Sequence, residues 1–343
     1  MFAALQLDSY ISIVNDTPGL LRYQKINLPL PVSDRLWSAA TLSERRNLQW
    51  SEPAGRERRS FASLMRDSLK TMGASNVNLP LNEGDFHLGL CVMRIGVWEA
   101  AQEFNCCSCS KQPVGDNFEA MEVEQPSEPT FEVWREHLKG WRRAVEKISP
   151  QLVSPVSLTV FHLSQISLHA NLELLQGTKQ CFTCAASAFG HQPNDEAEIQ
   201  AWAASKDARR AAVSAAQLRR IVTEPTPRQE SAIPVTTGLN PLAKTSMLHA
   251  AIVLCSYAYL LRTCPQCTSA TQRNSVPHIV QLLDAFGPDD EQVEGWVDGD
   301  GPAALGSVPL CKCHVRDIAE CFGQNMKGED RRSFERFFKK LIN

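Results

Sequence analysis

The chain has 343 residues, enough for one large domain or two smaller ones, and its contents of 43% apolar and 21% charged residues are typical of globular proteins. The formal net charge of −3 provides no basic face of the kind that duplex-binding modules use, which argues against nucleic-acid binding by this chain alone. Aromatic residues make up only 7%, while Leu, Ala, Glu and Arg are abundant, and this composition favours helices.

The first residues predict a helix that ends early. Leu7–Pro18 has the pattern of the last turns of a helix, and Pro18-Gly19 follows as a stop signal. Because the helix is already under way close to Met1, without room for a capping sequence, we expect that an upstream part is missing. Residues 1–14 have no basic region or cleavage site of a signal peptide. The twelve cysteines are therefore expected to be reduced thiols in the cytosol or nucleus.

Helical periodicity continues along the chain. In Phe131–Ile148 the apolar residues recur at spacings of three and four, as on one face of an amphipathic helix. Asp195–Val222 starts with Asp195 and Glu198 at capping-box spacing and then carries a row of alanines on one face. In chain order, the predicted helices are Asp85–Phe104, Phe131–Ile148, Ser157–Leu175, Asp195–Val222, Thr245–Arg262 and Asp330–Ile342.

The longest apolar run, Met247–Leu261, is shorter than the stretch of about 20 residues that spans a bilayer, so we expect a buried core helix and no membrane partner. Period-two alternation and Asn-Gly hairpin signals are almost absent from the sequence. The predicted fold is therefore all-α, with stacked antiparallel helices.

Three polar stretches rich in Pro, Gly or acidic residues interrupt the helices, at 110–129, 223–241 and 287–309. Their composition predicts long surface loops or disordered insertions. We expect residues 1–343 to form one helical domain, truncated at its N-terminus.

Five blocks of sequence carry a resemblance to a known family. They are Asp8–Pro18 with Leu28–Pro31 and Leu36–Ala40, then Ser60–Met65, Phe161–Ala170, Trp202–Ala211 and Ala250–Leu261. In this order and spacing they resemble the fungal-specific transcription factor domain. That domain is the regulatory, or middle homology, region of fungal zinc-cluster factors and of some factors with Cys-Cys-His-His fingers.

The resemblance implies a nuclear regulatory domain that controls transcription by RNA polymerase II and has the transcription machinery or coactivators as partners. A homodimer is left open. In the family, DNA binding and zinc belong to an N-terminal module that this chain lacks, so neither a cofactor nor a metal is expected here. The family shares packing motifs rather than an active site, so no catalytic residue is carried over and no enzyme is expected. One alternative is a stand-alone helical interaction protein that modulates a full-length factor.

A second alternative is a helical metal-dependent protein that uses its cysteines. Zinc is held by four nitrogen or sulfur ligands, and paired ligands are a common half-site. The sequence has four groups of closely spaced cysteines, and none of them is followed by a second half-site at finger spacing. Reduced thiols in helix ends and loops are therefore the favoured interpretation. The pairs are Cys106, Cys107 and Cys109; Cys181 and Cys184; Cys264 and Cys267, which His278 follows; and Cys311 and Cys313 with His314.

His162 and His169 lie seven residues apart on one predicted helix, and Glu173 follows four residues after His169. This spacing allows a metal site, although histidines of this kind are more often satisfied core residues. A Cys-His or Ser-His-Asp site assembled from distant residues is left open, but motifs such as Gly-x-Ser-x-Gly and His-Glu-x-x-His are absent from the sequence.

Charged segments supply further candidates. Arg45-Arg46, Arg56–Arg59 and Arg331-Arg332 are short basic clusters, for which solvated faces are favoured over nuclear import or phosphate contact. Asp289–Asp298 mixes acids with Trp296 and Val297, which suits either an activation segment that docks into a coactivator or an ordinary acidic loop. For the basic amphipathic helix at Asp330–Ile342, terminal packing is favoured over partner binding.

Overall fold

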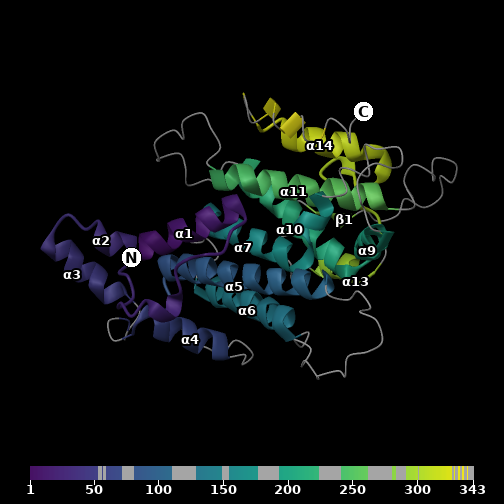
Figure 1. Cartoon of the computed structure of the whole chain (residues 1–343). Coiled ribbons are helices and arrows are strands. Elements are labelled where there is room, and N and C mark those ends of the chain that lie inside the picture. The colour runs from purple at the N-terminus through teal and green to yellow at the C-terminus, as the bar shows by residue number, and fades with distance from the viewer. Residues whose placement is uncertain are drawn as a thin grey trace, which may run out of the picture. The chain divides into compact units, whose positions relative to one another are not determined.

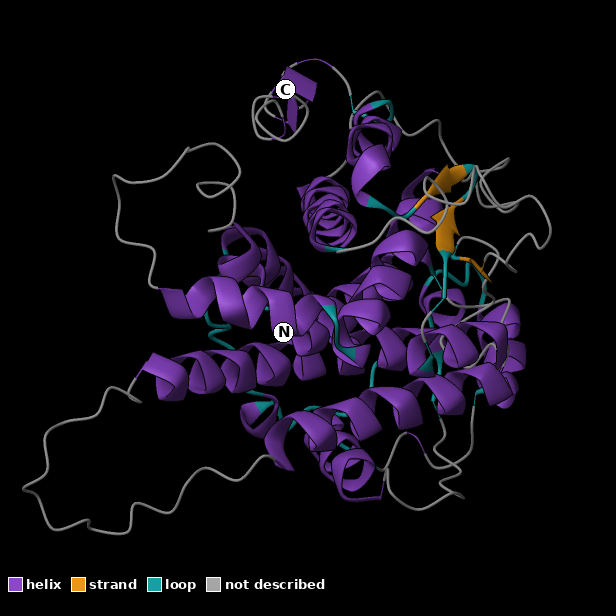
Figure 2. Ribbon diagram, turned by 90° about the vertical axis from the view of Figure 1, so that its right-hand side faces the viewer, coloured by secondary structure: helices purple, strands orange, loops and turns teal. Residues whose placement is uncertain are grey.

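The computed structural model consists mainly of helices (Figure 1). The residues it describes are 1–52, 56, 59–71, 81–109, 129–148, 154–176, 193–223, 241–261, 280–282, 291–299, 301–326, 328, 331, 332, 334, 335 and 338. Within these residues the fold is predominantly helical with one small three-stranded sheet, which confirms the predicted all-α class (Figure 2).

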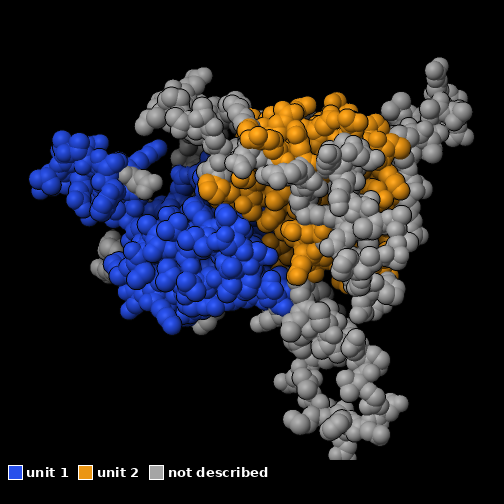
Figure 3. Space-filling model, turned by 45° about the horizontal axis from the view of Figure 1, so that its top comes forward, with its two compact units in different colours: residues 1–164 blue, residues 165–343 orange. Residues whose placement is uncertain are grey.

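The chain divides into two compact units, Met1–Ser164 and Gln165–Asn343 (Figure 3). The sequence predicted one helical domain over residues 1–343. The helices that start in the first unit are α1 (Phe2–Asn15), η1 (Tyr23–Lys25), α2 (Asp34–Trp37), α3 (Leu42–Ser51), α4 (Phe61–Thr71), α5 (Glu83–Cys109), α6 (Pro129–Ile148) and α7 (Pro155–His169). The second unit contains α9 (Pro193–Ala203), α10 (Lys206–Thr223), α11 (Pro241–Leu260), β1 (Val280–Gln281), α13 (Glu291–Asp298), β2 (Ala303–Leu305), β3 (Val308–Pro309), η6 (Lys312–His314) and α14 (Val315–Gly323).

The stop signal after the first helix acts as predicted. Helix α1 ends at Asn15, and Asp16 takes the left-handed conformation with a φ of 51°. The carboxylate of Asp8 then accepts hydrogen bonds from the backbone N–H groups of Leu20 and Leu21, each at 2.9 Å. The chain is therefore turned back sharply after α1.

Helix α5 is the centre of the first unit. It packs antiparallel to α6, because Gly89 of α5 lies against Trp141 and Gly96 lies against Trp134. The Trp141 side chain is fully buried, and its Nε1–H donates to the carbonyl oxygen of Phe86 at 3.0 Å. The glycines remove the two side chains that would separate the helices, so the tryptophan rings lie directly on the α5 backbone.

Helix α1 also packs on α5, but it runs in the opposite direction to α6. Tyr10 pairs with His87, and Asp16 accepts a hydrogen bond from Trp98 Nε1 at 2.8 Å. The residue numbers rise together along both helices, so α1 runs parallel to α5. The prediction of antiparallel stacking therefore holds for α5 and α6 but not for this pair.

Helices α10 and α11 form the core of the second unit. The alanine row predicted on α10 is buried, including Ala208, Ala211 and Ala215. Nearly every side chain of α11 from Met247 onwards is also buried, as expected from its long apolar run. Small side chains on α10 allow the two helices to approach closely.

The predicted helix Asp195–Val222 is two helices, α9 and α10, with a break at Ala204 and Ser205. Ser205 is the N-cap of the second helix, since its Oγ accepts a hydrogen bond from the N–H of Ala208 at 3.1 Å. Its own N–H donates to the carbonyl oxygen of Trp202 at 2.8 Å. The hydrogen bonds of Ser205 therefore start a second helix in place of the continuous helix that was predicted.

The segment 287–309 is not a loop where the structure describes it. Residues 291–298 form α13, and two strands follow, with β2 parallel to β1 and antiparallel to β3. Trp296 is buried edge-on against Tyr257, and Val297 is buried beside it in the sequence. Both apolar residues belong to the core, so the activation-segment interpretation of these residues is wrong.

The other two predicted loops, 110–129 and 223–241, lie outside the described residues except for Pro129, Thr223 and Pro241, which belong to helices. In the C-terminal segment, Phe334 and Phe338 are buried and lie in tilted contact with ring centroids 4.4 Å apart, in agreement with terminal packing. Among the described helices, none has the length and apolar character needed to cross a bilayer.

The contact between glycine and tryptophan predicts a large loss of stability on adding a single methyl group. A Cβ on residue 89 or 96 would overlap the tryptophan ring, so Gly89→Ala and Gly96→Ala should each lower the free energy of unfolding by about 1–3 kcal/mol through overpacking. Gly295→Ala, in exposed space on α13, is the control and should stabilise the chain by up to about 1 kcal/mol. Urea denaturation measures all three, and equal stability of G89A and G295A would contradict the packing.

Candidate functional site

The most unusual surface of the first unit is formed by residues 34–51, which comprise α2 and α3 and are called the arm here. Helix α3 has no buried residue, and its main packing partner is α2. In Figure 1 the two helices lie at the edge of the unit, away from α5 and α6. The arm is therefore an extension of the unit rather than part of its core.

The arm exposes large apolar side chains. Trp37, Leu42 and Trp50 are 82%, 77% and 90% exposed. Among the described residues, the exposed large apolar side chains are concentrated in the first 50 positions, and only Val133 and Val156 lie elsewhere. Two tryptophans and a leucine exposed within 14 residues are unusual on a folded surface, so the arm is a candidate interaction site.

The local sequence explains why α3 forms without a core. Thr41 is its N-cap, and the threonine Oγ1 accepts a hydrogen bond from the N–H of Glu44 at 3.1 Å. The Glu44 carboxylate accepts a hydrogen bond from the N–H of Ala40 at 3.0 Å. These bonds resemble a capping box and stabilise the first turn of α3. This helix was not predicted from the sequence, although Thr41-Leu42-Ser43-Glu44 carries the signal for its start.

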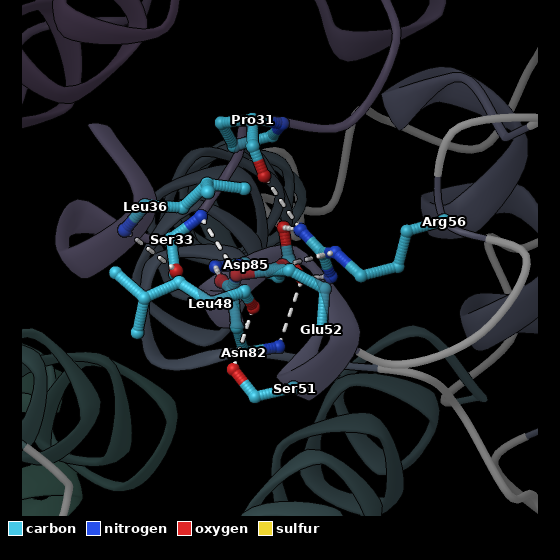
Figure 4. Close-up of polar contacts among 9 residues, drawn as sticks. All are labelled: Pro31, Ser33, Leu36, Leu48, Ser51, Glu52, Arg56, Asn82 and Asp85. Atoms are coloured by element: carbon cyan, nitrogen blue, oxygen red, sulfur yellow. Dashed lines mark hydrogen bonds and ion pairs between the residues drawn. The ribbon is translucent and has the colours of Figure 1, made fainter. Parts of the chain in front are cut away.

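A cluster of ionic groups, called the anchor here, holds the base of the arm. Its centre is the buried guanidinium of Arg56, which forms a two-point ion pair with the carboxylate of Asp85 (Figure 4). The Nε of Arg56 also lies 3.3 Å from Glu52, and its Nη2 donates to the carbonyl oxygen of Pro31 at 2.6 Å. The prediction that Arg56 lies on a solvated face is wrong, because its charge is paired inside the unit.

The anchor joins three separate segments of the chain. Glu52, directly after α3, accepts a hydrogen bond from the N–H of Ser33 at 3.3 Å, just before α2. Both ends of the arm therefore meet at one carboxylate, which pairs with Arg56. Asp85 belongs to the first turn of α5, so the arm is fixed to the central helix of the unit.

The side chain of Asp85 is fully buried, and desolvation raises the pKa of its carboxyl group. The ion pair with Arg56 and a hydrogen bond from the N–H of Asn82 oppose this rise. Asn82 and Asp85 cap each other reciprocally at the start of α5, with both bonds at 2.9 Å. The carboxylate is thus held by the helix start on one side and by the guanidinium on the other.

A second buried network lies between α1, α5 and α7. The Nε2 of His87 is 2.6 Å from the hydroxyl of Tyr10, and its Nδ1 is 2.9 Å from the Oγ of Ser157. Burial lowers the pKa of His87 to about 4 and raises the pKa of Tyr10 above its usual range. The Ser157 side chain is fully buried, so this Ser-His contact has no access to a substrate and acts in packing.

The structure describes only some of the predicted cysteine ligands. The described cysteines Cys91, Cys255, Cys311, Cys313 and Cys321 are all free thiols. The Sγ of Cys311 lies 3.0 Å from the Nδ1 of His314, while Cys313 is exposed. No group of three or more His, Cys, Asp or Glu residues among the described positions is arranged to hold a metal.

The remaining candidate ligands, Cys106, Cys107, Cys109, Cys181, Cys184, Cys264, Cys267 and His278, have side chains outside the described residues.

The two histidines of α7 have different surroundings. His162 is buried and lies edge-on to the ring of Phe161. The Nδ1 of His169 lies 2.8 Å from a carboxylate oxygen of Asp207 in α10, whereas Glu173 is exposed. The three candidate metal ligands are therefore not brought together. His169 instead links the end of α7 to α10.

The basic clusters also differ from one another. Arg45 and Arg46 are exposed on α3, in agreement with a solvated face. Arg331 is exposed and pairs with Glu335 at 2.7 Å. Arg59 forms a long, exposed pair with Asp67 at 3.9 Å.

The second unit also has a groove of about 770 Å³ between α9 and the end of α11. Its lining is mostly apolar, with Glu196 and Gln200 as the polar groups. Its size suits a small molecule, but both polar side chains lie at least partly in solvent and do not define a ligand.

Comparison of the chain with protein-family models, with curated proteins and with solved structures finds no match in any of the three.

The anchor predicts a strong effect from removing one charge. Arg56→Met leaves the buried Asp85 carboxylate without its partner and should cost about 3–5 kcal/mol in the free energy of unfolding. Arg56→Met combined with Asp85→Asn should cost less than Arg56→Met alone, because the fully buried Asp85 charge is then removed too and only the partly exposed Glu52 carboxylate loses its partner. Urea denaturation of the double-mutant cycle measures the difference.

Arg59→Met is the matched control and should change the stability by about 0–1 kcal/mol, since its pair is exposed. Local release of the arm is read from the rate of trypsin cleavage at Arg35, Arg45 and Arg46, which should rise in R56M but not in R59M. Equal cleavage rates in the two variants would show that Arg56 does not hold the arm.

His87 predicts a loss of stability in acid. Its pKa is about 4 when folded and near 6.5 when unfolded, so the unfolded chain binds more protons between these values. The contribution of His87 to the free energy of unfolding is fully present above pH 6.5. It should fall by about 3 kcal/mol as the pH drops to 4. His87→Gln should remove this part of the pH dependence, whereas Ser157→Ala should retain it because burial is the cause. An unchanged pH profile in H87Q would refute the assignment.

Proposed function

We propose that this chain is a helical protein-interaction module, the regulatory domain of a fungal transcription factor, and that it acts through the arm. The single observation that carries the proposal is the exposure of Trp37, Leu42 and Trp50 on a helical extension. Burying such side chains against a partner is favourable, by about 25 cal/mol for each Å² of apolar surface removed from water. The five sequence blocks support the assignment to transcriptional regulation.

In this proposal the chain works in the nucleus and does not read DNA bases. Its net charge of −3 is unsuited to duplex binding, so promoter contact is assigned to a separate module. The family resemblance places zinc in that module as well. The chain recruits the transcription machinery or coactivators, or holds a factor silent, without catalysing a reaction. The anchor keeps the arm in one orientation, so that a partner meets a preformed surface.

A tethered reporter assay tests the proposal. Fused to a heterologous DNA-binding domain, the chain should change transcription of a reporter at least threefold, either as an activator of a bare promoter or as a repressor of an active one. Trp37→Ser combined with Trp50→Ser should abolish the change, because the apolar contacts are lost. Val133→Ala combined with Val156→Ala, outside the arm, is the matched control and should keep it. If the intact chain leaves both promoters unaffected, the proposed function is wrong.

A further inference from the structure

The exposed face of the arm combines apolar and cationic groups. Arg35, Arg45 and Arg46 are exposed, and none of them forms an ion pair with another described residue. The three arginines outnumber Asp34 and Glu44, which gives the arm a net charge of +1, whereas the whole chain carries −3. The arm is thus a positive feature on a negative protein.

The groups on α3 are arranged as a ridge. Leu42, Arg46 and Trp50 follow one another at intervals of four residues, so they lie along one side of the helix. At 1.5 Å per residue the ridge is about 12 Å long, which matches two turns of a partner helix. Tryptophan and arginine are the residues that most often dominate the binding energy of protein interfaces.

Building on the proposed function, we infer that the arm binds an acidic amphipathic segment of a partner protein. The apolar side chains of the partner contact Trp37, Leu42 and Trp50, and its carboxylates pair with the arginines. Arginine binds carboxylates through two parallel hydrogen bonds, which gives such a contact orientation as well as attraction. The apolar residues of the partner occupy the ridge, and its acidic residues face Arg35, Arg45 and Arg46.

A second copy of the chain fits the ridge poorly. Leu42 and Trp50 are equally distant from Arg46, so antiparallel pairing of two α3 helices would place Leu42 of each copy on Trp50 of the other. The same pairing brings the two Arg46 side chains face to face, and like charges in contact are unfavourable.

Nucleic acid is also disfavoured as the occupant. Its binding depends on neutralising many phosphates, and the arm offers three arginines on a chain whose net charge is −3.

Peptide selection tests the chemistry of the partner. A displayed library of random 16-residue peptides is selected on the intact chain and counter-selected on the variant with Trp37→Ser and Trp50→Ser. The enriched sequences should combine Asp or Glu with Leu, Phe or Trp at helical spacing. Enrichment of basic or uncharged sequences, or of none that depends on the arm, would overturn the inference.

A charge exchange gives the decisive measurement. Measured by fluorescence anisotropy, Arg45→Glu combined with Arg46→Glu should lower the affinity for the selected peptide at least tenfold. Replacing the acidic residues of the peptide by Lys should restore most of the affinity for this variant. Arg331→Glu, an exposed arginine outside the arm, is the control and should leave binding unchanged. Unfolding curves check that each variant is folded. Tighter, arm-dependent binding of a 20-nucleotide single-stranded DNA in the same assay would assign the arm to nucleic acid instead.

The two proposals fail separately. If the tethered reporter responds to the arm but no acidic peptide is enriched, the inferred partner is wrong and the proposed function stands. If acidic peptides bind the arm and both promoters remain unaffected, the binding chemistry stands and the transcriptional role fails.

Discussion

The structure of the first unit depends on the need to pair a buried charge. The guanidinium of Arg56 is removed from water, and an unpaired charge in such a place costs several kcal/mol. Its partners come from the first turn of α5, from the residue that follows α3 and from a carbonyl before α2. A single side chain therefore links three separate segments of the chain. Helix α3 contributes no buried residue, and these bonds give the arm a defined position.

Helix α5 connects this anchor to the rest of the unit. Its first turn contains Asp85. In the following turns, Gly89 contacts Trp141 and Gly96 contacts Trp134. The same helix carries His87, whose ring is bonded on both sides by residues from α1 and α7. Because α5 is fixed by packing on one side and by buried hydrogen bonds on another, the anchor is attached to a rigid element. This is the condition under which an exposed helix keeps a preformed binding face.

The sequence predicted elements whose information is local and missed features that depend on distant residues. The regular spacing in Phe131–Ile148 and the apolar run ending at Leu261 were sufficient to place α6 and α11. The break before α10 was missed because Ser205 lies in an alanine-rich stretch that favours helix, and only its cap with Ala208 reveals the interruption. Segment 287–309 looked like a loop because Gly, Pro and Asp are frequent there, yet Trp296 finds an aromatic partner in α11. The pairing of Arg56 with Asp85 joins positions 29 residues apart and leaves no local pattern. The resemblance to a regulatory domain remains a prediction from the sequence blocks.

The size of the arm also limits how it can work. A tryptophan buries about 150–250 Å² when fully covered, so two tryptophans and a leucine supply only part of a standard interface of about 1,600 Å². Contacts of this size are characteristic of weak and reversible complexes. Their specificity then has to come from charge, since a small apolar patch accepts many partners while Arg35, Arg45 and Arg46 reject basic ones. A short exposed ridge with cations beside it is thus suited to regulated binding, in which partners are exchanged, rather than to a permanent assembly.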